Sequence, residues 1–125
     1  MDEYYVRKTF NTPEVFFSPD EGVLKIEGRS IPEDPGEFFD NIIEQLNQYY
    51  EKPKELTRID IKLEYINSGS SKYMLELMRI LKKNYEKGKD CIVNWYYEED
   101  DESIQELGQH YQATVQIPFK FIDYY

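Results

Sequence analysis

The sequence predicts a single-domain α/β fold, a STAS-like layered structure with a mostly central sheet, helices packed on it and an N-terminal β-hairpin. Strand-like and helix-like segments alternate along most of the chain. The 125 residues suit one domain, and 40% of them are hydrophobic although 32% are charged. We therefore expect residues 1–125 to form one unit with one core.

The first third of the chain predicts a hairpin followed by a helix. Two β-like runs, residues 14–17 and 23–28, flank a turn-rich segment at 18–22. Asp34 is placed to cap a helix with Pro35 at its first position. Apolar residues then recur at steps of three and four, and so should face a core: Phe38, Phe39, Ile42, Ile43, Leu46, Tyr49 and Tyr50.

The middle of the chain continues the alternation. Apolar residues at every second position predict a strand with one face in water: Ile59, Ile61, Leu63 and Tyr65. Residues 67–71 (Asn-Ser-Gly-Ser-Ser) form a turn-and-cap cluster. A second amphipathic helix follows this cluster and should end at Lys87-Gly88.

The last third predicts a strand, a short helix and a closing strand. Residues 91–97 are β-branched and aromatic, and residues 98–102 (Glu-Glu-Asp-Asp-Glu) are too charged to be buried. Ser103, with Glu106 three residues later, is expected to cap the third helix. The final strand is expected near residues 114–117, limited by Pro118.

Composition and motifs argue against several classes of function. A net charge of -10 repels nucleic acid and anionic lipid, and the sequence shows no signal peptide or apolar span, so we expect a cytoplasmic protein without membrane insertion. His110 lacks neighbouring metal ligands, and residues 98–102 lack the pattern of a calcium loop. Cys91 is expected to be a buried structural thiol. No cofactor, no metal and no enzyme chemistry are predicted.

The cluster at residues 67–71 allows two interpretations. It lies where a strand ends and a helix begins, so its hydroxyls should be close to free backbone N–H groups. The simpler interpretation is helix capping by Ser70 or Ser71, with Ser68 and Gly69 as turn formers. The other is a phosphorylation site, since helix N-termini favour negative charge.

Two segments resemble the SiaC family of bacterial regulatory phosphoproteins: residues 65–73 (Tyr-Ile-Asn-Ser-Gly-Ser-Ser-Lys-Tyr) and 93–97 (Val-Asn-Trp-Tyr-Tyr). The resemblance spans nearly the whole chain. It implies a fold similar to STAS-domain anti-sigma-factor antagonists, which switch protein partners. It also implies a partner kinase, a PP2C-type phosphatase and, as effector of the unmodified form, a diguanylate cyclase in cyclic-di-GMP signalling and biofilm behaviour.

The resemblance assigns a phosphoacceptor and a docking segment. The family motif usually reads Asn-Thr-Ser-Ser, which places the phosphoacceptor on Ser68, with Ser70 and Ser71 as alternatives. Gly69 replaces a serine of the motif and should loosen this loop. The partner-binding segment is expected to comprise Asn67, Ser68, Gly69, Ser70, Ser71 and Lys72.

Two alternatives stay open. A small-ligand-binding domain or enzyme would use a pocket lined by Trp95, Tyr96, Tyr97 and the acidic segment 98–102. The other alternative is a protein-interaction domain without a phosphorylation switch.

Overall fold

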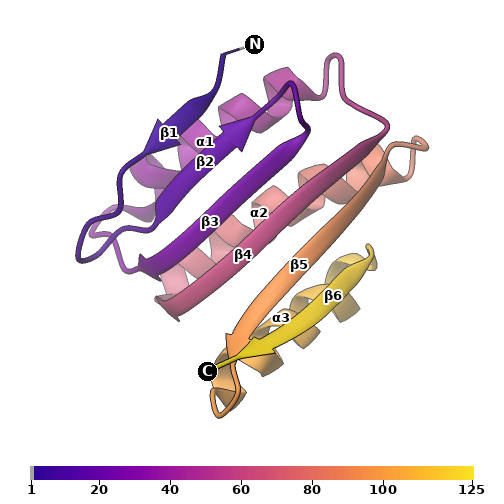
Figure 1. The fold of residues 1–125 in the computed structure, drawn as a ribbon. Coiled ribbons are helices and arrows are strands. Elements are labelled where there is room, and N and C mark those ends of the chain that lie inside the picture. Colours follow the sequence, from indigo (N-terminus) through magenta and orange to yellow (C-terminus); the bar gives the residue numbers. More distant parts are fainter. Residues whose placement is uncertain (1) are drawn as a thin grey trace.

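Six strands lie side by side in the order in which they occur along the chain, as Figure 1 shows. The computed structural model describes residues 2–125. Its strands are β1 (Tyr4–Val6), β2 (Glu14–Ser18), β3 (Val23–Ser30), β4 (Leu56–Ile66), β5 (Asp90–Glu98) and β6 (Phe119–Tyr124). The pairs β1–β2 and β2–β3 are antiparallel, whereas the pairs from β3 to β6 are parallel.

One helix makes each parallel connection: α1 (Pro35–Tyr49), α2 (Ser68–Tyr85) and α3 (Glu102–Val115). Successive crossovers between adjacent strands, all of the same hand, place their helices on the same side of a sheet. All three helices accordingly lie behind the sheet in Figure 1. The α/β class is confirmed, but the sheet forms one of two layers and is not central. None of the helices in residues 2–125 is long and apolar enough to cross a membrane.

The core lies between the sheet and the helices. Alternate residues of β3, β4 and β5 are fully buried there, among them Ile26, Ile61 and Val93. The helices contribute residues from one face each, such as Leu46 and Leu77. Burying an aliphatic side chain of this size stabilises a fold by about 1.5–3 kcal/mol, so this layer is the main source of stability.

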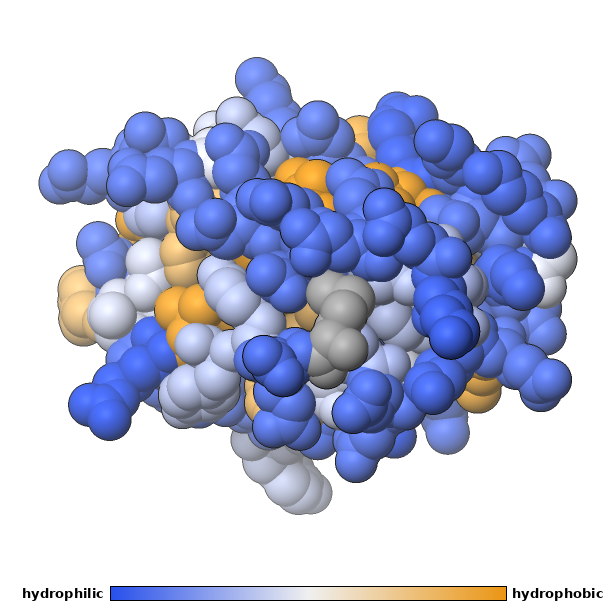
Figure 2. Space-filling model, turned by 90° about the horizontal axis from the view of Figure 1, so that it is seen from above, coloured by the Kyte–Doolittle hydropathy of each residue, from blue (hydrophilic) through white to orange (hydrophobic). Residues whose placement is uncertain are grey.

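The opposite face of the sheet is open to solvent and carries charged pairs. Arg58 lies 3.3 Å from Asp60, and Lys62 lies 3.7 Å from Glu27. This confirms the expected water-facing side of β4. The end of the molecule seen in Figure 2 is also mostly hydrophilic, with apolar residues in limited patches. Such surfaces agree with the net charge of -10.

The hairpin and the start of the first helix are confirmed. Strands β2 and β3 pair antiparallel across the turn. The Asp34 carboxylate accepts a hydrogen bond of 3.1 Å from the Glu37 backbone N–H, and Pro35 occupies the first turn of α1. The cap satisfies one of the free donors at the helix start.

The C-terminal elements differ from the prediction. Asp101, not Ser103, caps α3 by accepting a 3.0 Å hydrogen bond from the Ile104 N–H. The helix continues to Val115 and ends at Gln116, whose backbone is left-handed. The prediction of a strand at 114–117 is therefore wrong, because Thr114 and Val115 belong to the last turn of α3, where Val115 packs against the core. The closing strand β6 follows Pro118, and β1 was not predicted.

The thiol of Cys91 is expected to react slowly. Burial raises its pKa to about 11, and the residue is 3% exposed. At pH 8 about one thiol in a thousand is then ionised, against about one in four for an ordinary thiol of pKa about 8.5. A disulfide reagent at pH 8 should modify the native protein at least about 100-fold more slowly than the protein in denaturant. Equal rates would mean that Cys91 is accessible.

Candidate phosphorylation and docking site

Asn67 organises the start of α2. Its side-chain oxygen accepts a 2.8 Å hydrogen bond from the Ser70 N–H, so Asn67 is the N-cap. Its backbone N–H donates to the Ser30 carbonyl at 3.0 Å, which ties the helix start to the end of β3. The prediction that Ser70 or Ser71 caps the helix is wrong, because Asn67 has the extended backbone of a cap and both serines lie within the first helical turn.

The three serines of α2 lie in different environments. Ser68 is exposed at the first helical position. Ser70 is fully buried, and its hydroxyl has no hydrogen-bond partner among the described residues. The Ser71 hydroxyl lies 2.7 Å from the Tyr111 hydroxyl, which donates to the Ser71 carbonyl at 2.9 Å. Of these hydroxyls, that of Ser68 is the most accessible to another enzyme.

The contact between Ser71 and Tyr111 joins the start of α2 to α3. Tyr111 is 1% exposed, and burial raises the pKa of its hydroxyl to about 12. The phenol therefore stays protonated and can keep donating its hydrogen bond throughout the physiological range. This fixed link holds the first turn of α2 in place.

Gly69 does not loosen a loop, contrary to the prediction. It lies within α2, and a Cβ atom at this position would be 2.8 Å from Cγ of Pro35. The missing side chain thus allows α1 and α2 to approach closely at their N-termini. Gly36 has the same role on α1, where a Cβ atom would be 2.6 Å from the Tyr73 hydroxyl. The site rests on a tightly packed pair of helix ends.

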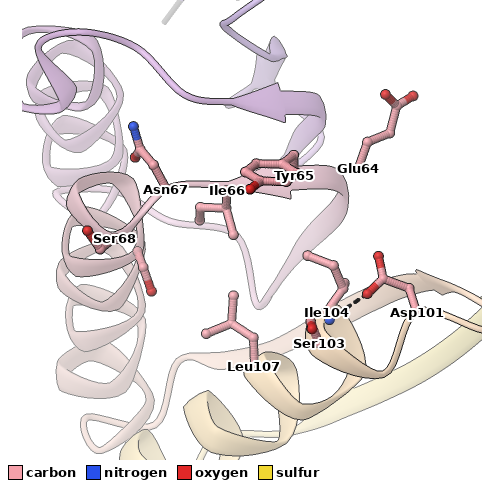
Figure 3. Close-up of a pocket in the computed structure, with 10 residues that line it drawn as sticks. Glu64, Tyr65, Ile66, Asn67, Ser68, Asp101, Ser103, Ile104 and Leu107 are labelled. Atoms are coloured by element: carbon pink, nitrogen blue, oxygen red, sulfur yellow. Dashed lines mark hydrogen bonds between the residues drawn. The ribbon is translucent and has the colours of Figure 1, made fainter.

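A groove of about 520 Å³ opens between the end of β4 and the N-termini of α2 and α3. Ile66, Ile104 and Leu107 provide its apolar surface, and their side chains point into the space between the two helices in Figure 3. The other lining residues are polar or lie at the edge: Glu64, Tyr65, Asn67, Ser68, Ser71, Asp101 and Ser103. Ser68 thus lies beside an open, mixed surface. Lys72 is exposed one helical turn after it.

A β-bulge shapes the last residues of β4. Gly28 pairs with Leu63 and Arg29 pairs with Tyr65, so Glu64 has no partner in the ladder. The extra residue shifts the alternation, and Tyr65 is 59% exposed, although the strand pattern predicted it on the buried face. Gly28 inside a strand pattern was the sequence signal that could have revealed the bulge.

The three aromatic residues proposed as one ligand pocket do not lie together. Trp95 is fully buried and donates a 2.9 Å hydrogen bond to the Ile104 carbonyl. Tyr97 follows Trp95 on the helix-covered face, whereas Tyr96 lines a shallow depression with Lys62 on the open face. The structure therefore contradicts this pocket. His110 is exposed on α3, and residues 2–125 contain no group of three His, Cys, Asp or Glu side chains suited to a metal ion.

Comparison with known proteins decides the family. The model of the "SiaC family regulatory phosphoprotein" matches residues 6–124, which is nearly the whole chain. The chain belongs to the SiaC family. This confirms the resemblance carried by residues 65–73 and 93–97. An uncharacterized protein of Pseudomonas aeruginosa (strain UCBPP-PA14) is 24% identical over 119 residues, covering 95% of this chain and 94% of that protein.

Solved structures of the family share the fold. Apo-SiaC from Pseudomonas aeruginosa superposes with a TM-score of 0.90 at 24% identity, covering 98% of this chain and 99% of that one. SiaC in complex with the diguanylate cyclase SiaD, which it activates, superposes with a TM-score of 0.92 at 23% identity, covering 97% and 99%. The six-stranded sheet and its helices are therefore the SiaC fold.

Proposed function

We propose that this SiaC family protein, acting as one domain over residues 1–125, is a phosphorylation-controlled partner switch. Its unmodified form binds an effector protein, and phosphate on Ser68 blocks that binding. A partner kinase adds the phosphate and a PP2C-type phosphatase removes it. The observation that carries the proposal is the exposed hydroxyl of Ser68 at the first position of α2, beside an open groove.

The position of Ser68 suits a phosphate on physical grounds. A phosphate brings up to about two negative charges, and the N-terminus of an α-helix stabilises them. The phosphate would add its negative charge to a groove that is already lined by the carboxylates of Glu64 and Asp101. Phosphorylation is therefore compatible with the folded protein, but it makes the docking surface more negative and so changes which partner the surface can bind.

Ser70 and Ser71 are less accessible than Ser68, which favours Ser68 as the residue that accepts the phosphate. A kinase would have to extract Ser70 from the core or break the hydrogen bond between Ser71 and Tyr111. The docking segment proposed for residues 67–72 would then present Ser68 and Lys72 to a partner, whereas Ser70 is buried beneath this surface.

We further propose a diguanylate cyclase as the effector, in the cytoplasm and within cyclic-di-GMP signalling that controls biofilm behaviour. The support is the SiaC of Pseudomonas aeruginosa, which is found in complex with the cyclase SiaD as its activator and whose fold covers 97% of this chain. On this proposal the protein is a regulator and carries out no catalysis itself.

The test is to locate the phosphate in protein purified from its native cells. Peptide mass spectrometry should find phosphate on Ser68, and treatment with a PP2C-type phosphatase should remove it. The Ser68→Ala variant should stay unmodified in the same cells, with Ser103→Ala, a second exposed serine, as matched control. Phosphate on Ser70 or Ser71 would move the site, and none under several growth conditions would contradict the switch.

A further inference from the structure

An aromatic and cationic cluster lies next to the groove and shares Tyr65 with it. The Arg29 guanidinium carbon is 4.7 Å from the ring centroid of Phe10 and 6.0 Å from that of Tyr65. These two rings are among the most exposed large apolar groups of the protein, at 77% for Phe10 and 59% for Tyr65. The bulge at Glu64 is what brings Tyr65 to this position.

The cluster is held in place by the backbone. Phe10 lies in a tight turn, in which the Thr9 N–H donates to the Thr12 carbonyl at 3.0 Å. The next residue, Asn11, accepts a 2.9 Å hydrogen bond from the Ile31 N–H at the end of β3. These bonds hold the backbone on both sides of Phe10, so that a partner covering the ring has mainly the side chain to order.

Arg29 has unused hydrogen-bonding capacity. Its Nε atom is buried without a hydrogen-bond partner, and no carboxylate of residues 2–125 lies at ion-pair distance from the guanidinium. A guanidinium fixed beside aromatic rings keeps its planar donors oriented, and those donors match the two oxygens of a carboxylate.

The cluster adjoins the candidate phosphorylation site. Arg29 precedes Ser30, whose carbonyl accepts the hydrogen bond from the Asn67 N–H, and Ser68 follows directly. Tyr65 also lines the groove that Ser68 borders. The cluster and the groove therefore form one continuous surface around the start of α2.

We propose that Phe10, Arg29 and Tyr65 form an anchor that binds a carboxylate of the effector protein, with the two rings covering an apolar neighbour of that carboxylate. A few residues carry most of the binding energy in protein interfaces, and tyrosine, tryptophan and arginine are enriched among them. The proposal rests on the proposed function and explains the direction of the switch. Phosphate on Ser68 would repel the partner's carboxylate and compete with it for Arg29.

The test measures binding of the unmodified protein to each purified full-length diguanylate cyclase of its source organism. For the cyclase that binds, Arg29→Ala and Tyr65→Ala should each weaken binding by at least about tenfold, and Phe10→Ala by about fivefold. Arg29→Lys should bind the cyclase nearly as weakly as Arg29→Ala, because an ammonium group lacks the planar donors of a guanidinium. Arg58→Ala and Tyr5→Ala are the matched controls, since Arg58 is already paired with Asp60 and Tyr5 is 58% exposed; both should change binding by less than about twofold.

Three other outcomes would overturn the anchor, and one of them would overturn the proposed effector as well. If a cyclase binds the wild-type chain and Arg29→Ala equally well, the anchor is wrong and the proposed function stands. Equal losses for Arg29→Ala and Arg58→Ala would show an effect of net charge alone and also overturn the anchor. If no cyclase binds the wild-type chain, both the proposed effector and the anchor are wrong. Unchanged thermal unfolding of Phe10→Ala, whose side chain is exposed, excludes misfolding as the cause of its weaker binding.

Discussion

Replacing Gly108 by alanine is expected to lower the free energy of unfolding by about 3 kcal/mol, although alanine favours helices. Helix α3 crosses directly over Trp95, and a Cβ atom at position 108 would lie 2.5 Å from the indole ring. The ring has no room to move, because it is fully buried and hydrogen-bonded to the Ile104 carbonyl. For a domain of this length the loss corresponds to a fall of about 12 °C in the midpoint of thermal unfolding.

Two further variants separate the clash from other effects of the substitution. In the Trp95→Phe protein, where the ring is smaller, Gly108→Ala should lower the free energy of unfolding clearly less than it does in the wild type. Gly88→Ala, where a Cβ atom meets nothing within 4 Å but the backbone has a positive φ of 91°, should cost only about 1 kcal/mol. A Gly108→Ala protein as stable as the wild type would mean that α3 does not lie on Trp95.

The second large effect concerns binding. Ser68→Asp is expected to weaken binding of the effector by at least about 100-fold, because a fixed negative charge at the docking surface repels the partner's carboxylate. The fold should be intact or slightly more stable, since an acidic side chain in the first helical turn is favourable by up to about 1 kcal/mol. Calorimetric titration of the cyclase with each variant would measure the affinity, and thermal unfolding would report the stability.

Ser68→Asn is the matched control for Ser68→Asp, because it has nearly the same shape without the charge. It should weaken binding by less than about tenfold, and Ser68→Ala should bind like the wild type while resisting the kinase. Binding of Ser68→Asp at wild-type strength would refute the charge mechanism. Equal losses for the Asn and Asp variants would mean that steric bulk alone blocks the partner.

Local signals in the sequence predicted most of the elements. The cap at Asp34, the turn between β2 and β3 and the apolar periodicity of α1 and α2 each depend on residues close in the chain. The family resemblance directed attention to Ser68. Its exposure beside a groove, however, results from the packing of α2 against α3 and could not be predicted locally.

The misjudged features depend on contacts between distant parts of the chain. Val115 has a β-branched side chain, yet tertiary packing keeps it in α3. Gly69 suggested flexibility, but it marks close contact with Pro35. Phe10 and Arg29 lie 19 positions apart in the sequence, and they meet because Asn11 pairs with Ile31. No local pattern connects them.

The bulge in β4 makes chain length at this point as important as residue identity. With Glu64 unpaired, Leu63 faces the helices and Ile66 packs at the edge of the core, while Tyr65 reaches the surface. Loss or gain of a single residue between Leu63 and Asn67 would reverse the direction of the side chains that follow it in β4. Over evolution, this stretch should therefore accept replacements of individual residues far more readily than insertions or deletions.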